Sequence, residues 1–364
     1  MSLLLKEIRH RPLLWLLALV PVLFIVELRS PEAHNILFVL SVFSIIPLAA
    51  LLSHATESVA AKTGDAVGGL LNATLGNLTE LIIALTALAA GQYLLVKASI
   101  AGAIVTNVLF MLGASFLIGG IKYHVQEFNP RTARLQAGLL FLATIAMLIP
   151  SVLIDVDSAR SDSFIQILSL GLAVLLIATY GLGMLFSLQT HREFFGSSGN
   201  TESGEESWPM GLALVVLAVV TLLVALVSHV FVESVQHAAE AFGMTPAFVG
   251  FIVVALVGGA AEGVSAFSGA RKNRLDLSVG IALGSASQIA LFVAPVLVLV
   301  SYIIGPAPMD LQFWPGAVVM ILIAALTAAL VTSGGRSAWF LGVLLLMVYL
   351  VFATTLYLLP PQGG

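Results

Sequence analysis

The sequence predicts an all-α integral membrane protein, and three observations lead to this fold class. The chain has 364 residues, of which 59% are apolar and only 9% are charged, whereas a soluble domain carries about 25% charged residues. Its mean hydropathy is +1.08. The apolar residues are gathered in runs of about 20, which is the length a helix needs to cross a bilayer. A soluble fold of this size has no use for so much apolar surface.

Charge and cysteine content exclude several classes of function. The net charge of -4 is too weak to indicate a nucleic-acid partner. The chain has no cysteine, so disulfides, thiol catalysis and zinc–thiolate sites are excluded. The opening MSLLLKEIRHRP runs into an apolar stretch without a small-residue cleavage pattern. We therefore expect a retained first helix rather than a removed signal peptide.

Eleven apolar runs qualify as membrane spans between Pro, Gly and charged punctuation. The first contains Pro12 and Pro21, and the third and eighth are unusually rich in Gly and polar residues. The expected limits are 12–28, 36–60, 66–91, 97–119, 135–154, 163–188, 209–236, 246–270, 277–304, 313–333 and 337–358.

The distribution of basic residues tests this layout. If the N-terminus is cytoplasmic, 12 of the 15 Lys and Arg residues fall on the cytoplasmic side and only Arg29, Lys97 and Arg160 fall on the other. Such a bias agrees with the positive-inside rule and would be lost if one span were missed in mid-chain. Eleven spans then place the C-terminus outside.

A polar segment, 191–208, divides the chain into two parts. It reads HREFFGSSGNTESGEESW and is rich in Ser, Gly and Glu. Two interpretations stay open: a solvated linker, or a cytoplasmic segment that attracts cations and regulates the protein. The expected organisation is an N-terminal helix (1–35), a five-helix unit (36–190), the acidic cytoplasmic linker (191–208) and a second five-helix unit (209–364).

The two five-helix units share an internal repeat. Glu80 lies in GNLTELIIAL and Glu262 in GGAAEGVSAF, and both segments read Gly-x-x-x-Glu. Each acid is followed by a helix that carries an amide, Asn107 after 27 residues and Gln288 after 26. Because five is an odd number of spans, the second unit enters the membrane upside down. Two inverted five-helix repeats with a site where they meet are typical of secondary transporters.

Glu80 and Glu262 need a partner because an isolated carboxylate in a bilayer is costly. No Lys or Arg lies inside the expected spans except at their ends. Protons, a bound cation, or each in turn must therefore balance the two charges. The nearby polar groups are oxygen donors, which suit hard cations, chiefly Ca²⁺, with Na⁺, Mg²⁺ or Mn²⁺ as weaker options. These donors are Asn77, Thr79, Asn107, Ser285, Ser287 and Gln288.

Other polar residues inside the spans are candidates for a proton or ion pathway. Glu57 lies near the cytoplasmic end of the second span, and Glu233 and His237 lie near the outer end of the seventh. These two spans correspond in the repeats, so the residues are placed to line access paths. The alternative for Glu57 and His237 is a helix end that water reaches, and His54 and His229 are more often plain packing residues.

The chain resembles the cation/proton exchanger (Ca²⁺/H⁺ antiporter) family of the calcium/cation antiporter superfamily. The resemblance is carried by ATESVAAKTG (55–64), GGLLNATLGNLTELIIAL (68–85), GAAEGVSAFSGARKNRLDLSVGIALGS (259–285) and SQIALFVAPVL (287–297). It implies eleven helices, inverted repeats and Ca²⁺/H⁺ exchange through Glu80 and Glu262. It also implies supporting ligands from Asn77, Asn107, Ser285 and Gln288. One departure is that Gly259 and Gly263 stand where the family often has Asn and His.

The expected function is therefore Ca²⁺/H⁺ antiport that exports Ca²⁺ from the cytoplasm, with Ca²⁺ as a transported substrate and no cofactor. An antiporter of the same fold that couples to Na⁺ or carries Mn²⁺ or Mg²⁺ is the alternative. An intramembrane enzyme is disfavoured because no HExxH occurs and the Asp residues lie in loops or at helix ends, and a channel is disfavoured by the inverted repeats. The expected location is the cell (inner) membrane, as a multi-pass protein surrounded by lipid. The sequence leaves the oligomeric state open, a homo-oligomer included.

Overall fold

The computed structural model describes residues 11–152, 161–190 and 208–359, and these are almost entirely helical. Residues 1–10 and most of the predicted acidic linker, 191–207, lie outside the described residues. The part before the linker contains η1 (Pro12–Ala18), α2 (Leu19–Arg29), α3 (His34–Ala60), α4 (Asp65–Leu75), α5 (Leu78–Ala89), α6 (Tyr93–Val105), η2 (Thr106–Met111), α7 (Leu112–Tyr123), β1 (Val125–Glu127), α8 (Pro130–Val152), α9 (Ser161–Leu185) and η4 (Phe186–Thr190). The part after it contains α11 (Met210–Ala241), α12 (Pro246–Phe248), η5 (Val249–Val254), α13 (Ala255–Gly258), α14 (Ala260–Arg271), α15 (Leu275–Gln288), η6 (Ile289–Val293), α16 (Ala294–Ile304), α17 (Pro315–Thr332), β2 (Arg336–Ala338) and α18 (Trp339–Leu358).

The apolar runs predicted from the sequence coincide with helices. Among the described residues, nine helices are long and apolar enough to cross a membrane. The pair Pro246–Gly258 and Ala260–Arg271 bends by 57° at its break, and it makes a tenth if the two helices form one span. The remaining predicted run, 66–91, is divided into α4 and α5. The prediction of a multi-pass all-α membrane fold is thus confirmed at this level.

Helix starts follow from local sequence. Pro130 and Pro246 occupy the first positions of α8 and α12, where the missing N–H costs nothing. The side chains before them cap the helices. Asn129 Oδ1 accepts from the N–H of Arg131 at 2.9 Å, and Thr245 Oγ1 accepts from the N–H of Phe248 at 3.2 Å.

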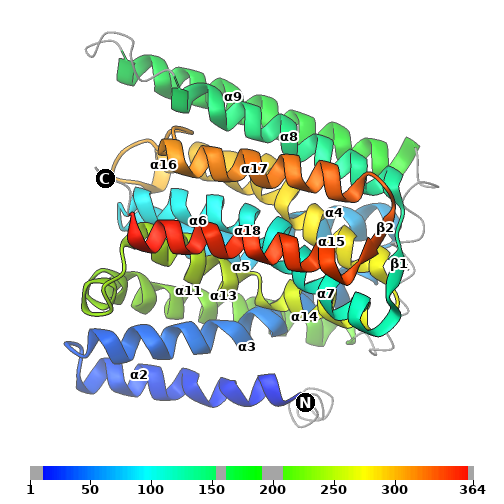
Figure 1. Cartoon of the computed structure of the whole chain (residues 1–364). Helices are drawn as coiled ribbons and strands as arrows, with labels where there is room; N and C mark the ends of the chain where they lie inside the picture. Colours follow the sequence, from blue (N-terminus) through cyan, green and yellow to red (C-terminus); the bar gives the residue numbers. More distant parts are fainter. Residues whose placement is uncertain (1–10, 153–160, 191–207, 360–364) are drawn as a thin grey trace.

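The helices run side by side across Figure 1, with α8 and α9 along its upper edge and α2 along its lower edge. The strands β1 and β2 lie at the right, which we call the sheet end, and the connection from α16 to α17 lies at the left. Inside this bundle α3 packs along α11, α6 crosses η5, and α15 packs against α8.

A two-stranded antiparallel sheet closes the sheet end and was not predicted. Val125 pairs with Ala338, and Glu127 pairs with Arg336. The Arg336 side chain also donates from Nε to Glu127 Oε1 at 2.8 Å. Strands of three residues are too short for alternating hydrophobicity to reveal them, so this pairing has no signal in the sequence.

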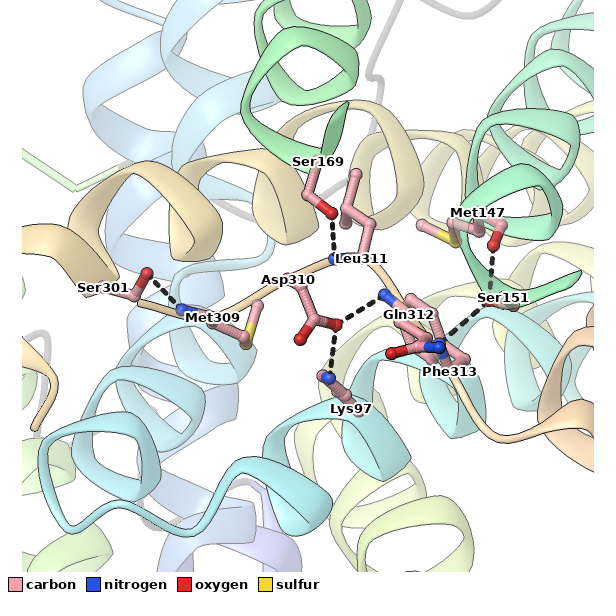
Figure 2. A network of polar contacts seen from close by, with 10 residues as sticks. All are labelled: Lys97, Met147, Ser151, Ser169, Ser301, Met309, Asp310, Leu311, Gln312 and Phe313. Atoms are coloured by element: carbon pink, nitrogen blue, oxygen red, sulfur yellow. Dashed lines mark hydrogen bonds and ion pairs between the residues drawn. The ribbon is translucent and has the colours of Figure 1, made fainter. Parts of the chain in front are cut away.

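The connection between α16 and α17 is tied down at the opposite end (Figure 2). The N–H groups of Met309, Leu311 and Phe313 donate to serine hydroxyls on three helices, at 2.7, 3.0 and 2.9 Å. The side chains of the same three residues are buried. The serines are Ser301 on α16, Ser169 on α9 and Ser151 on α8. An extended segment thus satisfies its backbone donors without forming a helix.

Asp310 supplies the charged contact in this segment. Its Oδ1 accepts from Lys97 Nζ on α6 and from the N–H of Gln312, both at 2.7 Å. We expect Asp310→Ala to lower the free energy of unfolding by about 2 kcal/mol, because Lys97 loses its partner in a half-buried place. Thermal unfolding of the full chain in detergent measures this. Asp310→Asn, which keeps an acceptor for Gln312, should lose less, and equal unfolding temperatures for Asp310→Ala and the parent would contradict the assignment.

The crossing of α6 and η5 depends on small residues. A Cβ at Gly102 would stand 2.1 Å from the carbonyl oxygen of Phe251 and 2.4 Å from its Cα. One turn earlier on α6, Ala98 meets Gly250, where a Cβ would stand 2.7 Å from the Ala98 Cβ. Small residues four apart allow backbones to touch in this way. The contact fixes α6 just before η2, which carries Asn107.

Candidate ion-binding site

Two helices are broken at the same point of the repeated motif. Between α4 and α5 the break is at Gly76 and Asn77, and between α13 and α14 it is at Gly259. In both cases the new helix places its glutamate in the first turn, as the third residue: Glu80 in α5 and Glu262 in α14. The Gly-x-x-x-Glu repeat seen in the sequence is therefore a repeated structural unit.

The start of a helix is a favourable place for a carboxylate, because the free N–H groups and the helix dipole are positive there. Glu80 is buried, with 9% of its surface exposed. The Oε2 atoms of Glu80 and Glu262 are both buried and lack a hydrogen-bond partner among the described residues. A buried carboxylate oxygen without a partner is costly, so each of these oxygens could accept a hydrogen bond or hold a cation.

The two acids lie near one another. The carboxylates of Glu80 and Glu262 are close enough to repel each other, and Glu57 adds a smaller repulsion on Glu262. Gly258, the last residue of α13, lies against Glu80, since a Cβ there would stand 3.0 Å from Glu80 Cγ and 3.3 Å from Oε1. The absence of a side chain at Gly258 gives the Glu80 carboxylate its room beside the second motif.

The four predicted amide and hydroxyl ligands are joined in one hydrogen-bonded series, which we call the amide chain. Asn107 Nδ2 donates to Ser285 Oγ at 2.8 Å, and Ser285 Oγ donates to Asn77 Oδ1 at 2.6 Å. Asn77 Nδ2 donates to Gln288 Oε1 at 2.6 Å. Asn77, Asn107 and Ser285 are buried. The series crosses from one half of the chain to the other at every bond.

The second motif differs from the first at the residue three before its acid. Asn77 stands there in the first motif and bonds to α15, whereas Gly259 stands there in the second. A Cβ at Gly259 would lie 3.4 Å from Asn107 Oδ1. Asn107 therefore approaches the backbone at the second break. Because Gly259 has no side chain to bond with, the Asn107 side chain donates to Ser285. The two halves are not equal in hydrogen bonding.

Both amides on the following helices sit at π-helical turns. Asn107 is the second residue of η2, and Gln288 immediately precedes η6. A π-turn widens the helix and shifts its backbone hydrogen bonds, and such turns are frequent at functional sites. Both halves thus carry a broken helix with an acid and a second helix with an amide at a π-turn.

The predicted pathway residues lie apart from this cluster. Glu57 is exposed on α3, and its Oε1 accepts from Ser53 Oγ at 3.4 Å. Glu233 faces outward on α11, where its Oε1 lies 3.2 Å from Nε2 of His229. The ring of His237 stacks on His34, with centroids 4.2 Å apart. No hydrogen bond, ion pair or ring contact between described residues links Glu57, Glu233 or His237 to Glu80 or Glu262.

The sequence matches one known family along most of its length. The profile of the family described as "Sodium/calcium exchanger protein" matches residues 34–189 and 212–358. The chain belongs to this family. Membership agrees with the family resemblance stated from the motifs around Glu80 and Glu262.

Relatives within the exchanger family are similar over nearly the whole chain. A "Ca(2+)/H(+) antiporter" of Aphanothece halophytica is 40% identical, covering 90% of this chain and 92% of the relative. The "Ca(2+)/H(+) antiporter ChaA" of Bacillus subtilis is 41% identical, covering 89% and 92%. Both relatives are named as transporters.

Solved structures share the exchanger fold. The structure of native YfkE superposes with a TM-score of 0.80 at 38% identity, covering 94% of this chain and 98% of that one. The H⁺/Ca²⁺ exchanger CAX has a TM-score of 0.71 at 17% identity, covering 96% and 88%, and at that identity it shows the fold alone.

Two features of the site were missed by sequence reasoning. The amide chain links residues 178 to 211 positions apart, and no pattern in one sequence reveals such pairs. The role of Gly258 as a neighbour of Glu80 was also missed, although the glycine pair before Glu262 was a signal that space is needed there.

Proposed function

We propose that this member of the exchanger family is a secondary transporter that exchanges Ca²⁺ for H⁺ across a membrane. One observation carries the proposal. Two half-helices each carry a glutamate in their first turn, and each glutamate has a buried carboxylate oxygen without a hydrogen-bond partner among the described residues. The relatives named Ca(2+)/H(+) antiporters, at 40 and 41% identity, support the same ions.

The chemistry of the cluster explains how one site serves two ions. Two carboxylates offset the charge of a divalent cation, and oxygen donors suit Ca²⁺. When the cation leaves, protons neutralise the same carboxylates, so the two substrates exclude each other. The proposed Ca²⁺ site consists of Glu80 and Glu262 with supporting oxygen ligands from Asn77, Asn107, Ser285 and Gln288. No cofactor and no enzymatic step are needed for this exchange.

The proposed architecture has eleven crossings and two inverted five-helix repeats, 36–190 and 209–364. These follow an N-terminal helix (1–35) and are separated by the linker 191–208. The matching positions of Glu80 and Glu262 at the two broken helices support the repeat. The division of the family match around the linker supports the boundaries. Alternating access follows if the cluster opens first to one side and then to the other.

The proposed orientation places the N-terminus in the cytoplasm and the C-terminus outside, in the cell (inner) membrane. The 12 against 3 distribution of basic residues supports it. In this orientation the proton gradient drives Ca²⁺ export. Glu57 then lines the cytoplasmic approach, and its exposure near the end of α3 supports this role. Glu233 and His237 line the outer approach in the same proposal.

Flux measurement in proteoliposomes tests the function. The purified full chain should take up ⁴⁵Ca²⁺ when the lumen is made acidic, and a lumenal pH dye should report alkalinisation in step. Dissipating the proton gradient with an ionophore should stop the uptake. Exchange that persists without a proton gradient but follows an imposed Na⁺ gradient would contradict H⁺ coupling.

Competition in the same assay decides between Ca²⁺ and other cations. Unlabelled Mn²⁺, Mg²⁺ and Na⁺ are each added at equal concentration outside the vesicles. We expect Ca²⁺ to compete best, because a cluster with two carboxylates and flexible amide oxygens suits a large divalent ion. Stronger competition by Mn²⁺ or Mg²⁺ would favour transport of another divalent cation by the same fold. Size-exclusion chromatography with light scattering establishes whether the protein is a homo-oligomer.

A further inference from the structure

A hollow lies on the surface of α8 near the sheet end, apart from the acidic cluster, and we call it the α8 groove. Its volume is about 460 Å³, within the range of roughly 300–1,000 Å³ that is usual for small-molecule sites. The α8 helix lies at the edge of the bundle in Figure 1. The described residues that line the groove are all on α8, at the spacing of one helical face, and they are Arg131, Arg134, Leu135, Gly138 and Leu139.

The end of the α8 groove nearest the sheet end is basic. Arg131 and Arg134 are exposed in the first two turns of α8, and Arg134 has no ion-pair partner among the described residues. The backbone at the start of α8 is already occupied, because Asn129 Oδ1 accepts from the N–H groups of Arg131 and Thr132 at 2.9 and 3.4 Å. The groove therefore offers an anion two guanidinium groups rather than a free helix N-terminus.

The rest of the α8 groove is apolar. Leu135 and Leu139 are half-buried, and Gly138 between them is exposed, with no atom within 4 Å of a Cβ placed there. Leu139 also borders α9, since a Cβ on Gly183 would stand 3.8 Å from its Cδ1. The same face of α8 continues away from the sheet end with the exposed residues Leu142, Ile145 and Ile149.

A basic end followed by an apolar face matches the chemistry of one membrane component. The phosphate of a phospholipid carries the negative charge that guanidinium groups bind through paired N–H donors. Its acyl chain can follow the apolar part of the groove along the helix. Inorganic phosphate would gain nothing from the apolar part, and a zwitterionic head group would bring a positive charge close to the two arginines. Basic pockets at the ends of membrane helices bind anionic head groups in this way.

We propose that the α8 groove is a binding site for an anionic phospholipid. The phosphate lies at Arg131 and Arg134, and one acyl chain lies along Leu135, Gly138 and Leu139. In the orientation proposed above, this lipid belongs to the cytoplasmic leaflet. The site is separate from the acidic cluster, and lipid binding there does not depend on which ions the protein exchanges.

Thermal unfolding of the full chain in detergent tests the site. Phosphatidylglycerol, phosphatidylcholine with the same acyl chains, and inorganic phosphate are added in separate titrations. We expect phosphatidylglycerol to raise the unfolding midpoint at a lower concentration than phosphatidylcholine, and inorganic phosphate to leave it unchanged. Native mass spectrometry of the same samples should show a phosphatidylglycerol molecule retained on the protein where phosphatidylcholine is lost.

Two substitutions separate the basic end of the groove from its apolar part. Arg134→Gln should raise the half-stabilising concentration of phosphatidylglycerol about fivefold, the factor expected for one basic residue near an anionic surface, without changing the response to phosphatidylcholine. Gly138→Leu fills the apolar part where nothing clashes and should weaken the binding of both phospholipids. Arg271→Gln is the matched control, because Arg271 is the exposed last residue of α14, outside the groove, and this variant should keep the parent's preference.

Four outcomes would overturn the proposal. The first is equal stabilisation of the parent by phosphatidylglycerol and phosphatidylcholine. The second is an Arg134→Gln protein that keeps the full preference for phosphatidylglycerol. Stabilisation by inorganic phosphate alone would assign the arginines to a soluble anion instead. An oligomer that dissociates in Arg134→Gln, measured by light scattering, would assign this face to a second copy of the chain.

Discussion

Replacing Glu80 or Glu262 by Gln abolishes Ca²⁺/H⁺ exchange while the protein stays folded. Glutamine has nearly the same shape, but it neither offsets the charge of a cation nor takes up a proton. Losing one charged ligand of a buried site costs roughly 3 kcal/mol, or about a hundredfold in affinity. We therefore expect ⁴⁵Ca²⁺ uptake driven by a pH gradient to fall to background in both variants. Their chromatographic profiles and thermal unfolding should match those of the parent or exceed it in stability, because an unpaired buried charge has been removed.

Glu127→Gln provides the matched control. Glu127 lies in β1 at the sheet end, exposed and paired with Arg336, so the same chemical change there should leave exchange at the parent rate. If Glu80→Gln or Glu262→Gln still moved ⁴⁵Ca²⁺ against a pH gradient like the parent, the site would be assigned wrongly. Calorimetric titration of each variant with Ca²⁺ then shows whether the variant has lost Ca²⁺ binding or only Ca²⁺ transport.

Replacing Gly102 by Ala should be the most damaging single change outside the acidic cluster. A Cβ at this position meets the backbone of Phe251 at 2.1 Å, and a backbone cannot turn aside as a flexible side chain does. The crossing of α6 and η5 must open instead. Overpacking of this kind costs about 3 kcal/mol. We expect a marked fall in the midpoint of thermal unfolding, together with weaker exchange because Gly102 lies just before the π-turn that holds Asn107.

Gly181→Ala is the control for this change. Gly181 is in α9, and a Cβ there has no atom within 4 Å, so unfolding should match the parent. A Gly102→Ala protein that unfolds at the parent temperature would show that α6 and η5 are not packed as tightly as the structure places them. In that case Gly102→Leu, which adds a larger side chain, should also lower the unfolding temperature less than overpacking predicts.

The sequence predicted the parts of this protein that depend on local composition. Apolar runs marked the helices, because a bilayer imposes both their length and their polarity. The acids stood out because a carboxylate is so costly in an apolar run. Glycine next to Glu80 and Glu262 indicated an opened backbone, and the structure has breaks at Gly76 and Gly259. The roles proposed for the acids remain predictions that the flux measurements test.

Features that join distant segments were beyond such reasoning. The amide chain requires the relative rotation of two helices, and a rotation by one residue would turn Ser285 away from Asn77. The segment around Asp310 is ordered by serines from three helices, none of which is near it in sequence except Ser301.

The amide chain also constrains how this protein can diverge. Its members come alternately from the two halves of the chain. Each member in the middle of the series therefore forms its hydrogen bonds with residues of the other half. Replacing Ser285 by an apolar residue removes a hydrogen-bond partner from both Asn107 and Asn77. Selection can accept this change only if both neighbours change as well. If one half were exchanged for the corresponding half of a distant homologue, the partners that these hydrogen bonds require would have to be exchanged with it.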